Sequence, residues 1–291
     1  YVWPSFAHKK ARVRVVVVQV VASAGVKASG LVPSLVAGMV DKDVKVREAI
    51  QSALKQIGRP HSKVLSHLVR LSRHENYNVR LEAVHALGRY EQRGVGAASA
   101  IVERLGESDR PQIASAASKA LVAMGKYAVP ALLKGTRSSQ AKVRSGSVQA
   151  LASIGEPVSK ITPSLNRCLR DPVSSVKLAA IKALGKLGQF SGRNVPNLID
   201  ALKDSDSSVQ IQAARALGGL GPLAGRGVSS LAKLLEHEDQ VVRTAAAKAL
   251  GRIGPAAAPA SVVLAKRLGD VLTVRREAAV ALKKIGVGSE L

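Results

Sequence analysis

A stripe of apolar positions recurs nine times along the chain and predicts nine α-helices. Each copy begins at a valine or isoleucine and continues with apolar residues 4, 7, 8 and 11 positions later. At 100° per residue these positions fall on one face of a helix. One copy consists of Val209, Ala213, Ala216, Leu217 and Leu220. The copies start at Val13, Val46, Val79, Ile113, Val143, Val176, Val209, Val242 and Val274.

Signals for helix ends accompany these stripes. Glycine stands 12 positions after the start in eight of nine copies, where a left-handed residue would end the helix, and Glu91 is the exception. These glycines are Gly25, Gly58, Gly125, Gly155, Gly188, Gly221, Gly254 and Gly286. A second apolar segment begins about 13 residues before each start. Four of these segments carry a proline that we expect in the first helical turn, namely Pro33, Pro130, Pro163 and Pro196. Each unit is therefore predicted to be helix, turn, helix.

The spacing of the copies predicts how the units are organised. Successive starts are separated by 33, 33, 34, 30, 33, 33, 33 and 32 residues, a period typical of stacked solenoids. We expect a basic N-terminal arm (residues 1–12) followed by one solenoid (residues 13–291), an all-α, α-α superhelix of about nine helix-turn-helix repeats. The motif at either end has no polar capping helix, so we expect neighbouring protein subunits or RNA to cover both ends.

The repeated motif resembles that of a known family. Residues 242–254 read VRTAAAKALGRIG, and the pattern Val-Arg-x-x-Ala-x-x-Ala-Leu-Gly-x-Ile-Gly recurs with variations between residues 13 and 286. In this respect the chain resembles the HEAT-repeat superfamily, specifically the short HEAT-like repeats of phycobilisome-lyase-type proteins. The resemblance implies a superhelix with the first helices outside and the motif helices lining the concave side. It implies no single function, because such repeats occur in scaffolds, transport factors, lyase subunits and a few enzymes.

Composition narrows the class of protein and its compartment. The chain is 46% hydrophobic but only 2% aromatic, and no apolar run approaches the roughly 20 residues of a membrane span. The single cysteine, Cys168, cannot form an intramolecular disulfide, which favours a reducing compartment or an organelle interior. The first residue is Tyr1, as in a mature product after removal of a targeting segment or in a trimmed chain. We expect an intracellular protein, with the mitochondrion or plastid as candidate organelles.

The formal net charge of +24 on 30.3 kDa indicates an anionic partner such as nucleic acid, an anionic membrane surface or an acidic protein. Most aspartates lie in the turns just before the motifs, where we expect them to cap helices and pair with cations. These aspartates are Asp41, Asp43, Asp109, Asp171, Asp204, Asp206, Asp239 and Asp270. The cation one position after each motif start is assigned to a ladder between repeats. Its members are Arg14, Arg47, Arg80, Arg144, Lys177, Arg243 and Arg275.

Other cations gather at motif positions +6 and +10, which project away from the apolar stripe. Neither position holds an acid in any copy, whereas an unspecialised surface would mix both signs. We interpret these positions as a nucleic-acid-binding surface made of Arg89, Lys119, Lys182, Lys186, Arg215, Lys248, Arg252 and Lys284. Leu81, Leu178 and Ile211, at position +2, leave open a protein chain as the occupant of the same face.

No arrangement of residues indicates catalysis, a cofactor or a metal. His74-Glu75 and His237-Glu238 are similar to the iron-binding pairs of deoxyhypusine hydroxylase, a HEAT-like enzyme, but both precede the motif start and are predicted to be turn residues. The other histidines lack ligand spacing, and no nucleophile has a base and an orienting group. We expect no enzymatic activity.

Three hypotheses of function remain. The leading one is a non-enzymatic architectural protein that binds the phosphate backbone of structured RNA within a large ribonucleoprotein, such as an organellar ribosome. The alternative is a protein-protein adaptor or assembly factor that binds an acidic partner in a multisubunit complex. A bilin lyase subunit is the third, suggested by the family resemblance alone.

Overall fold

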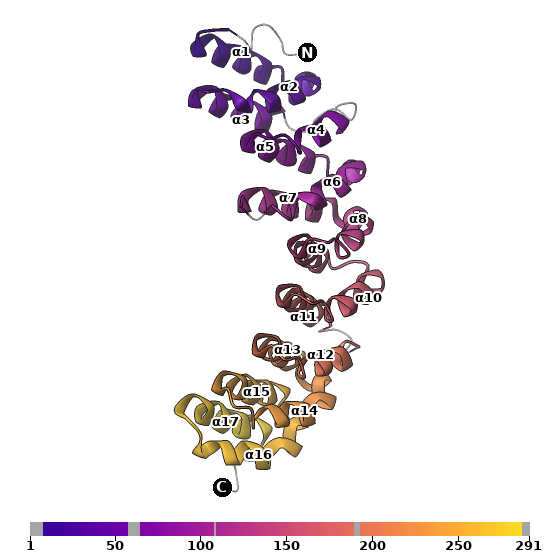
Figure 1. The fold of residues 1–291 in the computed structure, drawn as a ribbon, viewed down its shortest axis with the longest axis vertical. Helices are drawn as coiled ribbons and strands as arrows, with labels where there is room; N and C mark the ends of the chain where they lie inside the picture. Colours follow the sequence, from indigo (N-terminus) through magenta and orange to yellow (C-terminus); the bar gives the residue numbers. More distant parts are fainter. Residues whose placement is uncertain (1–7, 58–64, 108, 189–192, 287–291) are drawn as a thin grey trace. The chain divides into compact units, whose positions relative to one another are not determined.

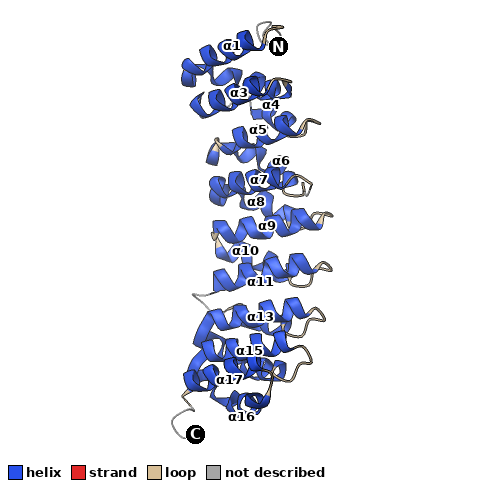
Figure 2. Ribbon diagram, turned by 90° about the vertical axis from the view of Figure 1, so that its left-hand side faces the viewer, coloured by secondary structure: helices blue, strands red, loops and turns tan. Residues whose placement is uncertain are grey.

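A computed structural model describes residues 8–57, 65–107, 109–188 and 193–286, and these residues form an all-α, HEAT-like solenoid. Figure 2 shows helices joined by loops, with no strand in any of these ranges. None of the described helices is long and apolar enough to cross a membrane. The contacts of the chain group into two compact units, Tyr1–Glu156 (unit 1) and Pro157–Leu291 (unit 2).

Each motif forms the second helix of its repeat, as predicted (Figure 1). In unit 1 the second helices are α1 (Ala11–Ser23), α3 (Val44–Ile57), α5 (Tyr77–Gly88), α7 (Pro111–Met124) and α9 (Ala141–Ile154). In unit 2 they are α11 (Ser174–Gly188), α13 (Ser207–Leu220), α15 (Gln240–Ile253) and α17 (Leu272–Ile285). The arm expected over residues 1–12 overlaps α1, because this helix already begins at Ala11. Residues 1–7 lie outside the described part of the chain.

The first helices are shorter and form the other layer of each unit. In unit 1 they are α2 (Val32–Ala37), α4 (Leu65–Leu71), α6 (Ala98–Arg104) and α8 (Val129–Gly135). In unit 2 they are α10 (Val158–Cys168), α12 (Val195–Ala201), α14 (Val228–Leu234) and α16 (Ser261–Lys266). Segments of 3₁₀ helix lead into several of them, such as Gly221–Gly227 before α14. In the described part of the chain, each repeat from α2 and α3 to α16 and α17 is therefore helix, turn, helix.

The prolines show where one expectation was wrong. Pro33, Pro130 and Pro196 lie in the first turn of their helices, as predicted. Pro163 lies well inside α10, because this helix begins directly after Pro157 instead of after a 3₁₀ segment. The α-helix thus runs through a stretch that is 3₁₀ helix in the preceding repeat, where Gly125–Ala128 leads into α8.

The glycines after the second helices adopt positive φ in six of the eight predicted cases, namely Gly25, Gly125, Gly155, Gly221, Gly254 and Gly286. Gly188 is instead the last residue of α11, and Gly58 lies outside the described residues. Glu91, the exception in the sequence, has φ 48°. It therefore adopts the left-handed conformation that glycine provides in the other copies, although a side chain makes this conformation unfavourable.

Neighbouring second helices approach closely wherever motif position +9 is glycine. A Cβ on Gly218 of α13 would lie 2.8 Å from the Cα of Ala249 in α15, and one on Gly251 would lie 2.9 Å from the Cα of Ala281 in α17. Gly88 of α5 meets Ala120 of α7 in the same way. Each of these glycines faces the +7 alanine of the next copy. Small residues on both sides thus set the close packing of the second-helix layer.

Candidate polyanion-binding surface

The turn before each second helix is held by its own side chains. Asp41 Oδ1 accepts the N–H of Asp43 at 2.9 Å, and Asp204 Oδ1 accepts the N–H of Asp206 at 3.0 Å. Asp206 in turn caps α13 by accepting the N–H of Ser208 at 2.8 Å. The expected capping role is confirmed for Asp206, whereas Asp41 and Asp204 stabilise the turn that precedes the helix.

His74 and His237 occupy the turn position that aspartate fills elsewhere. Nδ1 of His74 accepts the N–H of Asn76 at 3.0 Å, and Nδ1 of His237 accepts the N–H of Asp239 at 3.0 Å. Both side chains therefore stabilise turns. Among the described residues, no group of three or more His, Cys, Asp or Glu side chains could hold a metal ion.

Four of the seven cations predicted for the ladder pair with a carboxylate of the next copy, whereas Arg47 and Arg275 donate to carbonyl oxygens of their own turns. Arg14 pairs with Asp41 at 2.6 Å, Arg80 with Glu107 at 3.2 Å, Lys177 with Asp204 at 2.7 Å and Arg243 with Asp270 at 2.8 Å. Each carboxylate lies 27 residues later, in the turn of the next copy. The sequence indicated a ladder but not that its acids come from the following turn.

A ladder arginine also ties down its own turn. Nη1 of Arg243 donates to the carbonyl oxygens of His237 and Glu238 at 2.8 and 2.7 Å. The hydrogen bonds from Arg243 hold the pKa of Asp270 below its ordinary value. These cations are thus neutralised within the protein and serve its packing.

Seven of the eight predicted site residues lie exposed on the second-helix layer. Six of them belong to unit 2, namely Lys182, Lys186, Arg215, Lys248, Arg252 and Lys284, and we call these six side chains the basic surface. The seventh, Lys119, lies on α7 in unit 1. In unit 2, Lys182 and Lys186 are one helical turn apart on α11, and Lys248 and Arg252 are one turn apart on α15.

Arg89, the eighth predicted residue, lies elsewhere. It is half-buried, and its Nη1 donates to the carbonyl oxygen of Leu54 near the end of α3 at 2.6 Å. Burial lowers the pKa of its guanidinium. Arg89 thereby satisfies an end carbonyl of the preceding second helix, because position +10 of α5 lies beside the last turn of α3. The seven exposed residues are the ones available for a ligand.

Acids reach this layer from position +3, which lies beside the acid-free positions +6 and +10. Glu277 of α17 lies 3.5 Å from Nζ of Lys248, which is itself 51% exposed. In unit 1, Glu82 is buried, accepts a hydrogen bond from Gln51 at 3.2 Å and lies 3.5 Å from His85. No other residue of the basic surface has a carboxylate partner among the described residues.

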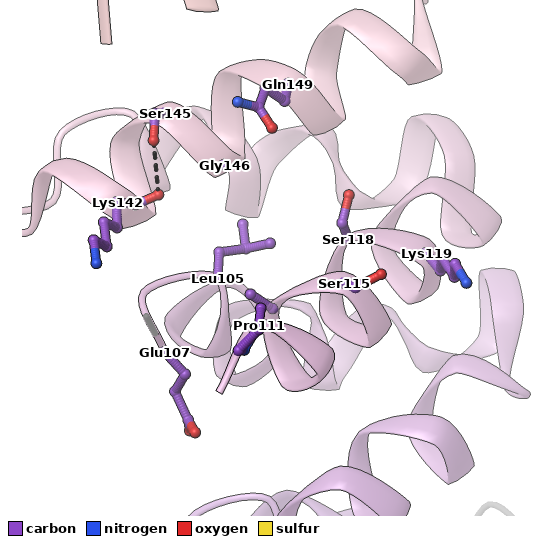
Figure 3. Close-up of a pocket in the computed structure, with 11 residues that line it drawn as sticks. Leu105, Glu107, Pro111, Ser115, Ser118, Lys119, Lys142, Ser145, Gly146 and Gln149 are labelled. Carbon is purple, nitrogen blue, oxygen red and sulfur yellow. Dashed lines mark hydrogen bonds between the residues drawn. The ribbon is translucent and has the colours of Figure 1, made fainter. Parts of the chain in front are cut away.

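A hollow opens in unit 1 where the ladder lacks a cation. Position +1 of α7 is Ala114, and a cavity of about 550 Å³ lies between α7 and α9 (Figure 3). Serines and a glutamine line it, with Lys119 and Lys142 on opposite sides. Nothing in the helical periodicity predicts this pocket, although alanine at a ladder position is a visible signal in the sequence.

The fold and the ladder define a helical-repeat solenoid, and comparison with known proteins gives its family. The family description HEAT repeats matches residues 32–122, 129–193 and 195–283. The chain belongs to the HEAT-repeat family. No curated protein matches it.

Solved structures with the same fold include a karyopherin and engineered proteins. The karyopherin Kap121p bound to the extreme C-terminus of the protein phosphatase Cdc14p is similar with a TM-score of 0.69 and 17% identity. The same karyopherin bound to Nup53p gives a TM-score of 0.68 and 17% identity. The chain aligns over 97% of its own length but spans only 37% of the karyopherin. An engineered protein gives a TM-score of 0.52 and 23% identity, with 97% of this chain and 87% of that protein covered. At these identities the likeness shows the fold alone.

Proposed function

We propose that this HEAT-repeat protein is a non-catalytic scaffold whose basic surface in unit 2 binds the phosphate backbone of RNA. The observation that carries the proposal is the division of cations into two groups. Ladder cations such as Lys177 and Arg243 are 18% and 14% exposed and have carboxylate partners. The cations of the basic surface are exposed, and within the described residues only Lys248 has a carboxylate nearby.

The chemistry of the surface favours phosphate as the ligand. Lysine and arginine that neutralise phosphates release counterions, which supplies affinity without reading bases. Positions +2, +6 and +10 of the unit 2 second helices contain no aromatic residue, so base stacking contributes nothing there. The surface would therefore recognise the shape of a folded RNA.

The setting of this function is a large ribonucleoprotein, for which an organellar ribosome is our candidate. Two apolar faces support contacts with neighbouring subunits in such a particle. Val16 and Val20 of α1 are 55% and 64% exposed, and Leu272 and Val280 of α17 are 73% and 42% exposed. Location in a mitochondrion or plastid is part of the same proposal.

The experiment replaces Lys182, Lys186, Lys248 and Arg252 together with alanine. We expect helicity to stay unchanged, because all four side chains are exposed. If each contacts one phosphate, the magnitude of the slope of log K against log salt concentration falls by about 3 to 4, at roughly 0.9 per duplex phosphate or 0.7 per single-stranded one. The measurement is a titration of a structured RNA at several salt concentrations.

The matched control replaces four other exposed lysines of unit 2 with alanine. They lie on the first helices or at the ends of these helices, and are Lys160, Lys203, Lys233 and Lys266. Both variants lose the same charge, so only a local contact distinguishes them. A control variant that loses as much salt dependence as the test variant would contradict the proposal.

The second candidate function is an adaptor that binds an acidic protein on the same surface. The half-buried Leu178 and Ile211 next to the cations favour it, and the similar structures of Kap121p contain protein partners. Copurification at physiological salt followed by nuclease treatment separates the two. Loss of the partner with nuclease supports RNA, and its survival supports the adaptor.

A further inference from the structure

The pocket between α7 and α9 in unit 1 owes its existence to small residues. Seven of the other eight copies carry a ladder cation at the position where α7 carries Ala114, and the turn position that would hold its acid is Ser138. The floor includes Gly146, where a Cβ would lie 3.1 Å from Cβ of Leu105. The cavity of about 550 Å³ is therefore built into the backbone packing and is not closed by a side chain of this layer.

Three polar side chains of the pocket are left without internal partners. Ser115 and Ser118 of α7 and Gln149 of α9 line the cavity (Figure 3). Within the described residues, none of these side chains makes a hydrogen bond or an ion pair. Ser145 differs, because its hydroxyl donates to the carbonyl oxygen of Lys142 at 3.2 Å, the dashed line in Figure 3. The first three are thus free to bind a polar ligand.

Charge flanks these neutral groups on both sides. Lys119 lies at one side of the pocket and Lys142 at the other (Figure 3), and both are exposed or partly exposed. The one acid of the lining, Glu107, is already paired with Arg80 at 3.2 Å and with Arg104 at 2.8 Å. The pocket therefore offers a neutral, hydrogen-bonding centre between two cations.

We propose that this pocket holds one ribose of the bound RNA and distinguishes RNA from DNA. A 2′-hydroxyl both donates and accepts hydrogen bonds, as do the hydroxyls of Ser115 and Ser118 and the amide of Gln149. Lys119 and Lys142 contact the phosphates on either side of that ribose. The inference rests on the proposed function, since it assigns to unit 1 the specificity that the phosphate contacts of unit 2 lack.

The test measures the affinity of the full chain for three single strands of one sequence: RNA, DNA and RNA methylated at every 2′ oxygen. We expect RNA to bind about 3- to 10-fold more tightly than DNA, the range given by one or two neutral hydrogen bonds. The methylated RNA should bind little more tightly than DNA, because its 2′ oxygen cannot donate a hydrogen bond and carries a methyl group. The triple variant Ser115→Ala, Ser118→Ala, Gln149→Leu should bind RNA as weakly as DNA, with its affinity for DNA unchanged.

A control variant carries Ser52→Ala and Ser153→Ala, two exposed serines of the second-helix layer outside the pocket. It should keep the preference for RNA. Equal binding of RNA and DNA by the wild type, or equal losses for both in the triple variant, overturns the inference but leaves the proposed function standing. If neither single strand binds, the inference is overturned, and the titration of structured RNA decides the proposed function separately. If polyglutamate binds the wild type but not the triple variant, and RNA binds both equally, the pocket takes an acidic protein segment and the inference is wrong.

Discussion

The second helices of unit 2 and those of unit 1 carry the same motif but build different surfaces. In unit 2, Gly185, Gly218 and Gly251 bring successive helices close together, and exposed cations stand on the resulting layer. In unit 1, Gly88 brings α5 close to α7 in the same way, but α7 carries Val122 at this motif position, and a pocket opens between α7 and α9. The small residues Ala114 and Gly146 leave a pocket in unit 1, whereas the glycines at position +9 bring the second helices of unit 2 close together.

The largest effect should come from filling one of the close approaches in unit 2. Gly218→Val adds a branched side chain where even a Cβ would lie 2.8 Å from the Cα of Ala249. We expect the free energy of unfolding to fall by about 3 kcal/mol, since the backbone of α15 must shift. Urea unfolding followed by circular dichroism measures this. Val122→Ala, at the same motif position of α7, should cost less than about 1 kcal/mol because Val122 is only half-buried. Equal losses in the two variants would show that the two units pack alike.

Breaking the ladder in unit 2 should have the next largest effect. Arg243→Met removes the hydrogen bonds to Asp270 and to two carbonyl oxygens of its own turn. We expect a loss of about 2 kcal/mol, which allows for solvent screening of a partly exposed pair. The control Arg275→Met affects an exposed arginine whose described contact is the carbonyl of Asp270 at 3.2 Å, and thermal unfolding should hardly change. A stable Arg243→Met variant would mean that the ladder does not hold the repeats together.

Substitutions at the left-handed position after a second helix should change the free energy of unfolding by about 1 kcal/mol, with opposite signs in the two units. Glu91→Gly in unit 1 should stabilise the protein, since it relieves a side chain at φ 48°. Gly221→Ala in unit 2 should destabilise it by a similar amount, because Gly221 has φ 58° and ψ −137°, a region open mainly to glycine. Denaturant midpoints of the two variants test this, and the same sign for both would contradict it.

The smallest effect concerns the pH dependence of stability. The hydrogen bonds from Arg243 lower the pKa of Asp270 in the folded protein. The unfolded chain, with an Asp pKa of about 3.9, therefore binds more protons near that pH, and the pair's stabilisation is lost as the pH falls from about 5 through the folded pKa. Arg243→Met should make unfolding less sensitive to acid in this range. A wild type and variant with parallel acid unfolding curves would contradict the assignment.

Much of the fold and part of the surface could be read directly from the sequence. The period of about 33 residues and the apolar stripe predicted each second helix. Most of the turn glycines adopt the expected positive φ. Residues at position +6, such as Lys182 and Lys248, are exposed as predicted, because helical geometry alone places this position on the face opposite the apolar stripe.

Contacts between copies depended on the tertiary structure. Arg89 obeys the same helical geometry as Arg252, yet it is half-buried, because the end of α3 lies beside it and offers the carbonyl of Leu54. Likewise Glu277 reaches Lys248 from the next copy, and the pocket beside Ala114 needs Gly146 from another helix. Sequence periodicity determines which side of its own helix a residue occupies. What fills the space on that side depends on residues about 30 positions away, whose approach is set by the packing of one repeat on the next.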